Sequence, residues 1–169
     1  MSDRKQDSGF TFVEVLIAIL LVGLAVAALM GANRAFTEAN DTGTDLSTAE
    51  FLIEQIKELT ALLPVVDPDG DNPPVPGVTP FGPDTGETLA DYDDLDDFDG
   101  ASFSPPISAE RISLGDYATF SQQVTVENVS GSNFEQVVSD HGSCFVRVTV
   151  SVFKNSQLIT TTSWLRALY

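Results

Sequence analysis

The sequence predicts an α+β fold, in which a long N-terminal helix packs by its second half against a small antiparallel β-sheet. Three observations predict it: an apolar run from Phe10 to Met30, a helical apolar pattern that continues to Leu63, and alternating apolar residues in the last third of the chain. With 169 residues, the chain has room for one modest domain and one additional element.

The apolar run is long enough to cross a membrane. Within Phe10–Met30 only Thr11, Glu14 and Gly23 are not hydrophobic. At about 1.5 Å per residue, a helix of this length spans the ~30 Å hydrocarbon core. An ionised carboxylate in that core is disfavoured by roughly 2.5–3.5 kcal/mol. Glu14 is therefore a candidate functional residue, provided that it has a partner.

The flanks of the run predict its orientation. Arg4 and Lys5 precede it, which favours a cytoplasmic N-terminus and places the acidic C-terminal domain outside the cytoplasm. A secretory signal peptide fits poorly, because the run is too long and no small-residue cleavage site follows it.

The segment Gly9–Leu21, G-F-T-F-V-E-V-L-I-A-I-L-L, resembles the N-terminus of type IV pilins and of type II secretion pseudopilins. The resemblance implies that a prepilin peptidase/methylase cleaves after Gly9 and methylates the new N-terminus at Phe10. It also implies that Glu14 pairs with the Phe10 amine of a neighbouring subunit, which would reduce the cost of burying either charge. Alternatively, Glu14 reaches the membrane interface from one turn inside.

The resemblance predicts a structural subunit, most like a minor pilin, that assembles with other pilin subunits into a type IV pilus or related filament. Before assembly, the chain would be a single-pass inner-membrane protein with an extracytoplasmic domain. The alternatives are a pseudopilin of a type II secretion system, or a membrane-anchored binding module that displays its acidic domain.

Five segments are expected: a leader at 1–9, a membrane or filament-core helix at 10–31, an amphipathic helix at 32–63, an irregular acidic region at 64–106 and a sheet at 107–169. The two helical segments form one helix that bends or frays near Gly43, among poor helix formers, and that ends at Pro64.

Two acidic stretches lie in the irregular region. Asp67, Asp69 and Asp71 alternate around a glycine, which suits either Ca²⁺ or a plain turn, so no metal site is assigned. Segment 91–99 carries six acids interleaved with Tyr92, Leu95 and Phe98, which we expect to anchor a solvated loop, with a cation or partner site as the alternative. Similar runs occur in some minor pilins of the mannose-sensitive haemagglutinin type.

Strands are expected in the last third. Segments 118–126 and 146–152 alternate apolar and polar residues, and Gln122 interrupts the apolar face of the first. Residues 154–157 form a plausible hairpin turn into a strand at 158–165.

Little in the sequence favours catalysis or nucleic-acid binding. The net charge of −17 and the scarcity of Lys and Arg oppose nucleic acid as a partner. His141 and Cys144 could form a nucleophile or ligand pair, but we expect turn and packing roles for them. With a single cysteine, no internal disulfide is possible. We expect no enzyme activity and no cofactor.

Overall fold

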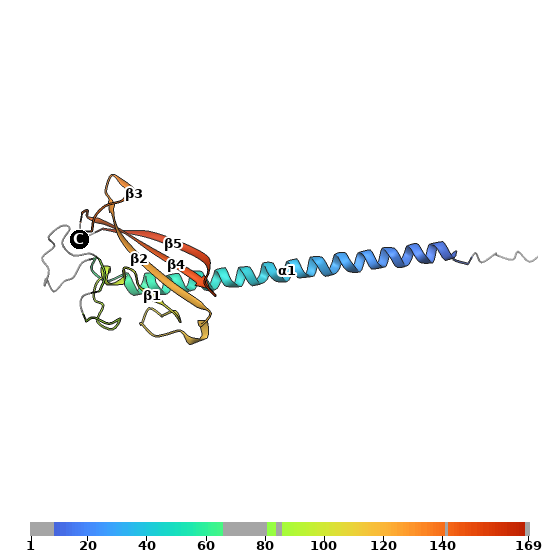
Figure 1. The fold of residues 1–169 in the computed structure, drawn as a ribbon, viewed down its shortest axis with the longest axis horizontal. Coiled ribbons are helices and arrows are strands. Elements are labelled where there is room, and N and C mark those ends of the chain that lie inside the picture. Colours follow the sequence, from blue (N-terminus) through green and yellow to red (C-terminus); the bar gives the residue numbers. More distant parts are fainter. Residues whose placement is uncertain (1–8, 66–80, 84–85, 141, 168–169) are drawn as a thin grey trace, which may run out of the picture. The chain divides into compact units, whose positions relative to one another are not determined.

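The computed structural model describes residues 9–65, 81–83, 86–140 and 142–167. Within these residues lie one long helix, two 3₁₀ helices and five strands (Figure 1): α1 Phe12–Thr60, η1 Asp96–Phe98, β1 Ser102–Phe103, η2 Gly115–Tyr117, β2 Phe120–Ser130, β3 Asn133–Val137, β4 Phe145–Lys154 and β5 Gln157–Ala167. The predicted α+β arrangement of a long helix and an antiparallel sheet is confirmed. The chain divides into two compact units, Met1–Gly43 and Thr44–Tyr169, which are described separately.

Helix α1 is uninterrupted through residues 40–44, so the fraying predicted near Gly43 is wrong. Threonine hydroxyls in this stretch bond back to the helix, as when Thr42 Oγ1 donates to the carbonyl of Glu38 at 2.9 Å. A single glycine costs only about 1 kcal/mol relative to alanine. Because starting a helix is much more costly than extending one, a helix already formed on both sides continues through such a site.

The C-terminal end of α1 is held by an arginine from the sheet. The helix ends at Thr60, before the predicted terminator Pro64. Arg166 Nη1 donates to the carbonyl of Thr60 at 2.6 Å, and its Nη2 donates to the carbonyl of Leu63 at 2.8 Å. These bonds satisfy carbonyls that the helix leaves without partners, and they place a cation at the negative end of the helix dipole.

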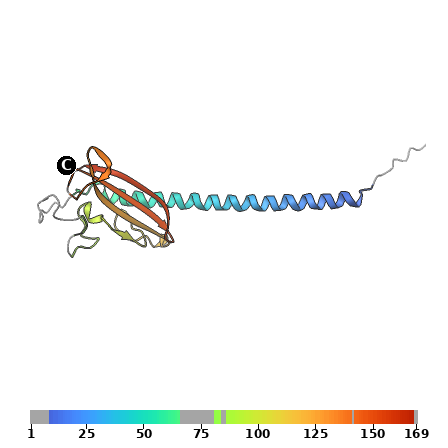
Figure 2. The ribbon, with the colours of Figure 1, turned by 45° about the horizontal axis from the view of Figure 1, so that its top comes forward.

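In the second unit the strands are antiparallel in the order β1-β2-β4-β5, and β3 pairs with the end of β2 (Figure 2). The predicted hairpin turn between β4 and β5 is confirmed. Its central residues Asn155 and Ser156 have φ of 49° and 67°. Both lie in the left-handed region that a two-residue type I′ hairpin requires.

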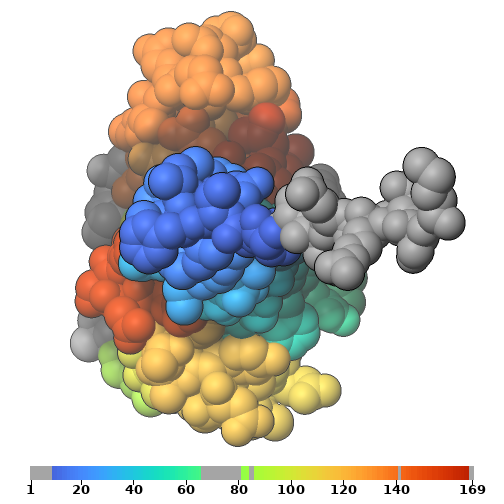
Figure 3. Space-filling model, turned by 90° about the vertical axis from the view of Figure 1, so that its right-hand side faces the viewer, coloured from blue at the N-terminus to red at the C-terminus, as the bar shows by residue number. Residues whose placement is uncertain are grey.

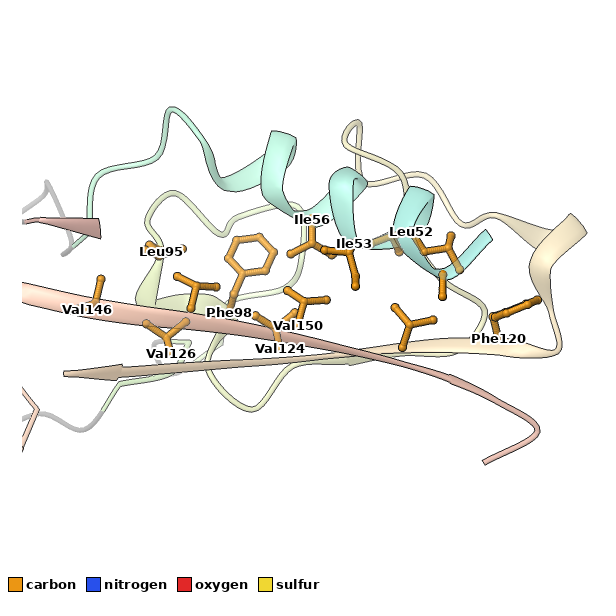
Figure 4. Packing of buried hydrophobic residues seen from close by; sticks show 14 of the residues in the cluster. Leu52, Ile53, Ile56, Leu95, Phe98, Phe120, Val124, Val126, Val146 and Val150 are labelled. Atoms are coloured by element: carbon orange, nitrogen blue, oxygen red, sulfur yellow. The ribbon is translucent and has the colours of Figure 1, made fainter. Parts of the chain in front are cut away.

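The core lies between one face of α1 and one face of the sheet (Figure 4). The valines of the predicted alternating segment all have no exposed surface: Val146, Val148, Val150 and Val152. They face the buried side of the helix: Ala49, Leu52, Ile53 and Ile56. Leu95 and Phe98 complete the core from the acidic segment. Period-two and period-3.6 patterns in the sequence thus become the two layers of one core.

Gln122 interrupts the apolar face of β2 because it is a buried polar link. Its Nε2 donates to the carbonyl of Leu52 on α1 at 2.8 Å, and its Oε1 accepts from the amide of Ile107 at 2.8 Å. Helix, sheet and preceding loop are therefore joined by one side chain with no exposed surface.

Two strands lie outside the predicted set. β3 has all five residues exposed, so no buried face imposes an alternating pattern on its sequence. β1 falls inside the region predicted to be irregular and pairs through only two residues. Figure 3 shows the β3 segment (orange) and residues near η2 (yellow) at opposite ends of the second unit.

We predict that Gln122→Leu lowers the free energy of unfolding by about 1–3 kcal/mol, because the buried amide of Ile107 loses its acceptor. Urea unfolding of the full chain in detergent, followed by the fluorescence of Trp164, measures the effect. Gln123→Leu, the same change at the neighbouring exposed position, is the control and should be nearly neutral. Equal effects of the two variants would contradict the assigned role.

Candidate functional site

The predicted processing residues lie at the start of the described chain. Gly9 and Phe10 precede α1, and Phe10 is 87% exposed. Glu14 lies in the first turn of the helix, also exposed. Phe10 and Glu14 lie on the same side of the helix, where both line one open hollow. Its lining is Phe10, Glu14, Val15, Ala18, Ile19 and Val22. The geometry is therefore that of an accessible junction beside a carboxylate on an apolar helix face.

Thr11 and Glu14 form a capping box at the start of α1. The amide and the hydroxyl of Thr11 donate to Glu14 Oε2 at 3.0 Å and 3.1 Å. In return the amide of Glu14 donates to Thr11 Oγ1 at 3.3 Å. This reciprocal arrangement satisfies amides that the first turn of a helix leaves without partners.

Sequence reasoning missed Thr11, although the signal was present. The pattern Thr-x-x-Glu ahead of an apolar run is the sequence signature of a capping box. Both hydrogen bonds from Thr11 go to Oε2, and among the described residues none is made to Oε1. Glu14 is thus oriented by Thr11 while one of its oxygens remains able to accept.

The rest of the apolar run is exposed. Segment 12–30 of α1 has no buried residue, and by length and composition α1 includes a stretch able to cross a membrane. Contiguous apolar surface of this extent marks a face that is covered by lipid or by another protein.

The acidic segment is partly anchored as predicted, but its acids do not all face water. Leu95 and Phe98 have no exposed surface, and Tyr92 packs edge-on against Phe98 with ring centroids 5.1 Å apart. Asp94 and Asp97 are also buried, 2% and 6% exposed. They are drawn inside because apolar residues flank them in the same short turn, so the prediction of a fully solvated loop is wrong.

Asp94 and Asp97 cap each other's backbone. The amide of Asp97 donates to Asp94 Oδ1 at 3.1 Å. In return the amides of Asp93 and Asp94 donate to Asp97 Oδ2 at 3.0 Å and 3.4 Å. Burial and, as the next cause, a hydrogen bond with the side chain of Asp96 together raise the pKa of Asp94 to about 8. Burial also raises the pKa of Asp97 to about 7, with the charge of Asp94 as the next cause.

These carboxylates can serve in two ways. Asp93, Asp94 and Asp97 each bring an oxygen to within 4.8 Å of the other two, a density of oxygen ligands that suits Ca²⁺. The same oxygens can share protons instead, as expected of neighbouring carboxylates that cannot all ionise. The two uses differ in how stability depends on pH and on cations.

An arginine from the following loop holds this turn in place. Arg111 adopts a φ of 64° and donates through Nη1 to the carbonyls of Leu89 and Ala90 at 3.1 Å and 3.0 Å. Its Nη2 donates to the carbonyl of Tyr92. Its guanidinium is thus committed to backbone carbonyls that precede the buried acids.

The other predicted positions add no site. Asp67, Asp69, Asp71 and His141 lie outside the described residues. Cys144 is exposed and directly precedes β4, so the expected packing role is wrong for it. The strand face that points into the core begins two residues later, at Val146.

Residues 4–30 match the family model described as the prokaryotic N-terminal methylation motif. This motif is the signature of type IV pilins and pseudopilins, and the long apolar helix that begins at Phe12 fits it. No curated protein and no solved structure matches the chain. The motif thus supports a pilin or a pseudopilin on the first part of the chain, and it implies processing by prepilin peptidase and assembly with other pilins.

We predict that Thr11→Val weakens the first turn of α1 by about 1 kcal/mol, because Glu14 loses the acceptor for its amide. Amide hydrogen exchange of the full chain in micelles should show the Glu14 amide exchanging several times faster. Thr11→Ser keeps the hydroxyl and should retain the protection. Thr37→Val, which removes a hydroxyl inside the helix, is the control. An unchanged Glu14 amide in Thr11→Val would contradict the capping role.

We predict that stability falls as pH rises from 5 to 8. An unfolded aspartate titrates near 3.9, so the raised pKa values mean that the folded chain binds more protons in this range. The stabilisation is complete below about pH 4 and is lost as pH rises through the folded pKa values of about 7 and about 8. Each group loses about 1.4 kcal/mol per pH unit below its folded pKa, so a loss on the order of 5 kcal/mol is expected, measured by urea unfolding at several pH values.

The double variant Asp94→Asn with Asp97→Asn should flatten this pH dependence, whereas Asp116→Asn, at an exposed position, should preserve it. A parent chain with no slope between pH 5 and 8 would contradict the prediction. Addition of Ca²⁺ at pH 8 distinguishes cation binding from proton sharing. If the carboxylates bind Ca²⁺, the ion restores the stability lost at high pH, whereas Mg²⁺, which only screens their charge, does not.

Proposed function

We propose that this chain is a structural subunit, most like a minor pilin, of a type IV pilus or related filament. The observation that supports the proposal most strongly is the start of α1, where an accessible Gly9–Phe10 junction leads into a fully exposed apolar face with one oriented carboxylate. In this proposal the peptidase cleaves at that junction and methylates Phe10.

Cleavage supplies a cationic partner for Glu14 in addition to Thr11. Before processing, the nitrogen of Phe10 is part of a peptide bond and carries no charge. Cleavage frees it as an amine, and Glu14 Oε1 remains able to accept from the amine of a neighbouring subunit. Pairing removes much of the cost of burying both charges in the filament core and fixes the register between subunits.

The proposed location follows from the same segment. Residues 10–31 span the inner membrane before assembly, with the basic Arg4 and Lys5 in the cytoplasm and the acidic unit outside. After assembly the apolar face of the helix is covered by neighbouring helices instead of lipid. The role proposed is one of assembly, and no catalytic step is assigned.

A minor position is favoured over a major one by two features. The chain has a single cysteine, Cys144, so it cannot close the C-terminal disulfide loop of many major pilins. The long segment rich in Pro, Gly and Asp between the helix and the main strands also suits a sparsely incorporated subunit better than a densely packed one. A pseudopilin of a type II secretion system is the alternative, because the same N-terminal motif serves both, and the genes beside this one would distinguish them.

We predict that Glu14→Ala leaves processing and membrane insertion intact but strongly reduces incorporation into filaments, because the neighbour's amine loses its partner. Mass spectrometry of the membrane-extracted protein should show a methylated N-terminus at Phe10 in both parent and variant. Quantification of the subunit in sheared filaments measures incorporation, with Glu38→Ala as the control on the same helix. Wild-type incorporation of Glu14→Ala, or Met1 retained in assembled parent, would contradict the proposal.

A further inference from the structure

Strand β5 is an open edge of the sheet (Figure 2). It is the last strand in the order β1-β2-β4-β5, and within the described part of the chain its backbone bonds only to β4. The opposite edge is different, because β1 and β3 each pair with part of β2.

The register shows which backbone groups of β5 point outward. The amide of Asn155 donates to the carbonyl of Thr119, which fixes the phase of the hydrogen bonds between β2 and β4. In antiparallel strands every second residue bonds to a given neighbour, so the odd-numbered residues of β4 bond to β2 and the even-numbered ones bond to β5. Thr162 and Trp164 pair with the β4 residues that bond to β5. The groups that face the open edge are therefore those of the exposed residues Thr161, Ser163 and Leu165.

The β5 edge has few of the features that prevent another strand from pairing with an exposed edge, namely proline, charged side chains and bulges. Segment 158–165 contains no proline and no charged residue, and its one bulge lies at the hairpin end, opposite Val152 and Phe153. Long uncharged edges of this kind readily accept a further strand.

A hollow of about 550 Å³ lies between β5 and the flank of α1. Thr162 lines it from the strand, and Glu50, Ile53 and Glu54 line it from the helix. It is open at this point because Thr162 is exposed, whereas its partner Val150 is fully buried. A strand added to β5 would place alternate side chains over this hollow.

The negative charge of the second unit favours a basic segment as the strand that adds to β5. After Gly43 the chain has five Lys and Arg residues, and each has an internal partner: Lys57 with Glu54, Arg147 with Glu127, Lys154 with Asp45, and Arg111 and Arg166 with backbone carbonyls. The remaining acids are therefore in excess. Of the two at the hollow, Glu54 is paired with Lys57, so Glu50 supplies the negative charge that a further strand would meet. A net charge of −17 disfavours a second copy of this chain at the edge.

We propose that β5 and the flank of α1 form a docking site for an extended segment of another protein that carries Lys or Arg at alternate positions. The segment adds to the sheet as a strand, its backbone bonding to Thr161, Ser163 and Leu165. Its basic side chains point into the hollow toward Glu50. This inference does not rest on the proposed assembly into filaments.

The test uses the full chain in detergent micelles and a synthetic peptide of alternating Val and Lys. Amide hydrogen exchange should show new protection of Thr161, Ser163 and Leu165 on binding, with Thr162 and Trp164 already protected in the free chain. The same peptide with Glu for Lys should bind at least about tenfold more weakly. The Lys peptide with N-methyl groups on its edge-facing amides should also lose binding, since it cannot continue the ladder.

Three variants locate the site. Ser163→Pro removes an outward amide at a position where an edge strand tolerates proline, and it should abolish binding. Glu50→Lys should weaken binding about tenfold, whereas Glu110→Lys, the same charge change at another exposed position, should not. Binding without new protection of the outward amides, equal effects of Glu50→Lys and Glu110→Lys, or self-association through β5 would each overturn the proposal.

Discussion

The contact between one face of α1 and the valines of β4 is the interaction on which the second unit depends. Ile53 and Ile56 supply the helix side, and the alternating valines from Val146 to Val152 supply the sheet side with no exposed surface. The other features attach to this contact: the acidic turn enters it through Phe98, and Gln122 links its two layers. The contact is weaker at β5, where Trp164 packs against the core only in part and Thr162 is exposed, and this leaves the hollow open.

Charge is distributed unequally between inside and outside. The cations of the second unit bond to partners within the unit. Arg166 links β5 to the end of α1, Lys154 links the hairpin to α1, and Arg111 binds the turn before η1. The acids remain in excess, and two of them, Asp94 and Asp97, are buried with raised pKa values. The same imbalance thus makes the buried turn sensitive to protons and makes the exterior attractive to basic partners.

In the filament proposed above, Glu14 would serve both locally and in assembly. Its hydrogen bonds with Thr11 complete the first turn of α1 and fix the side chain in place. A carboxylate has more acceptor capacity than this cap uses, so a neighbouring amine can be added without breaking the cap. Orientation by Thr11 then reduces the entropy lost when subunits meet.

The sequence alone was sufficient to predict the long apolar helix and the buried face of β4, and to nominate Gly9, Phe10 and Glu14 as candidate residues. Each is encoded by a local pattern: a continuous apolar run, a short motif or strict alternation. The burial of Asp94 and Asp97, the linking role of Gln122, the exposure of Cys144 and the open edge of β5 became visible in the folded structure. These depend on which distant segments pack together, and a residue's neighbours along the chain do not specify those contacts.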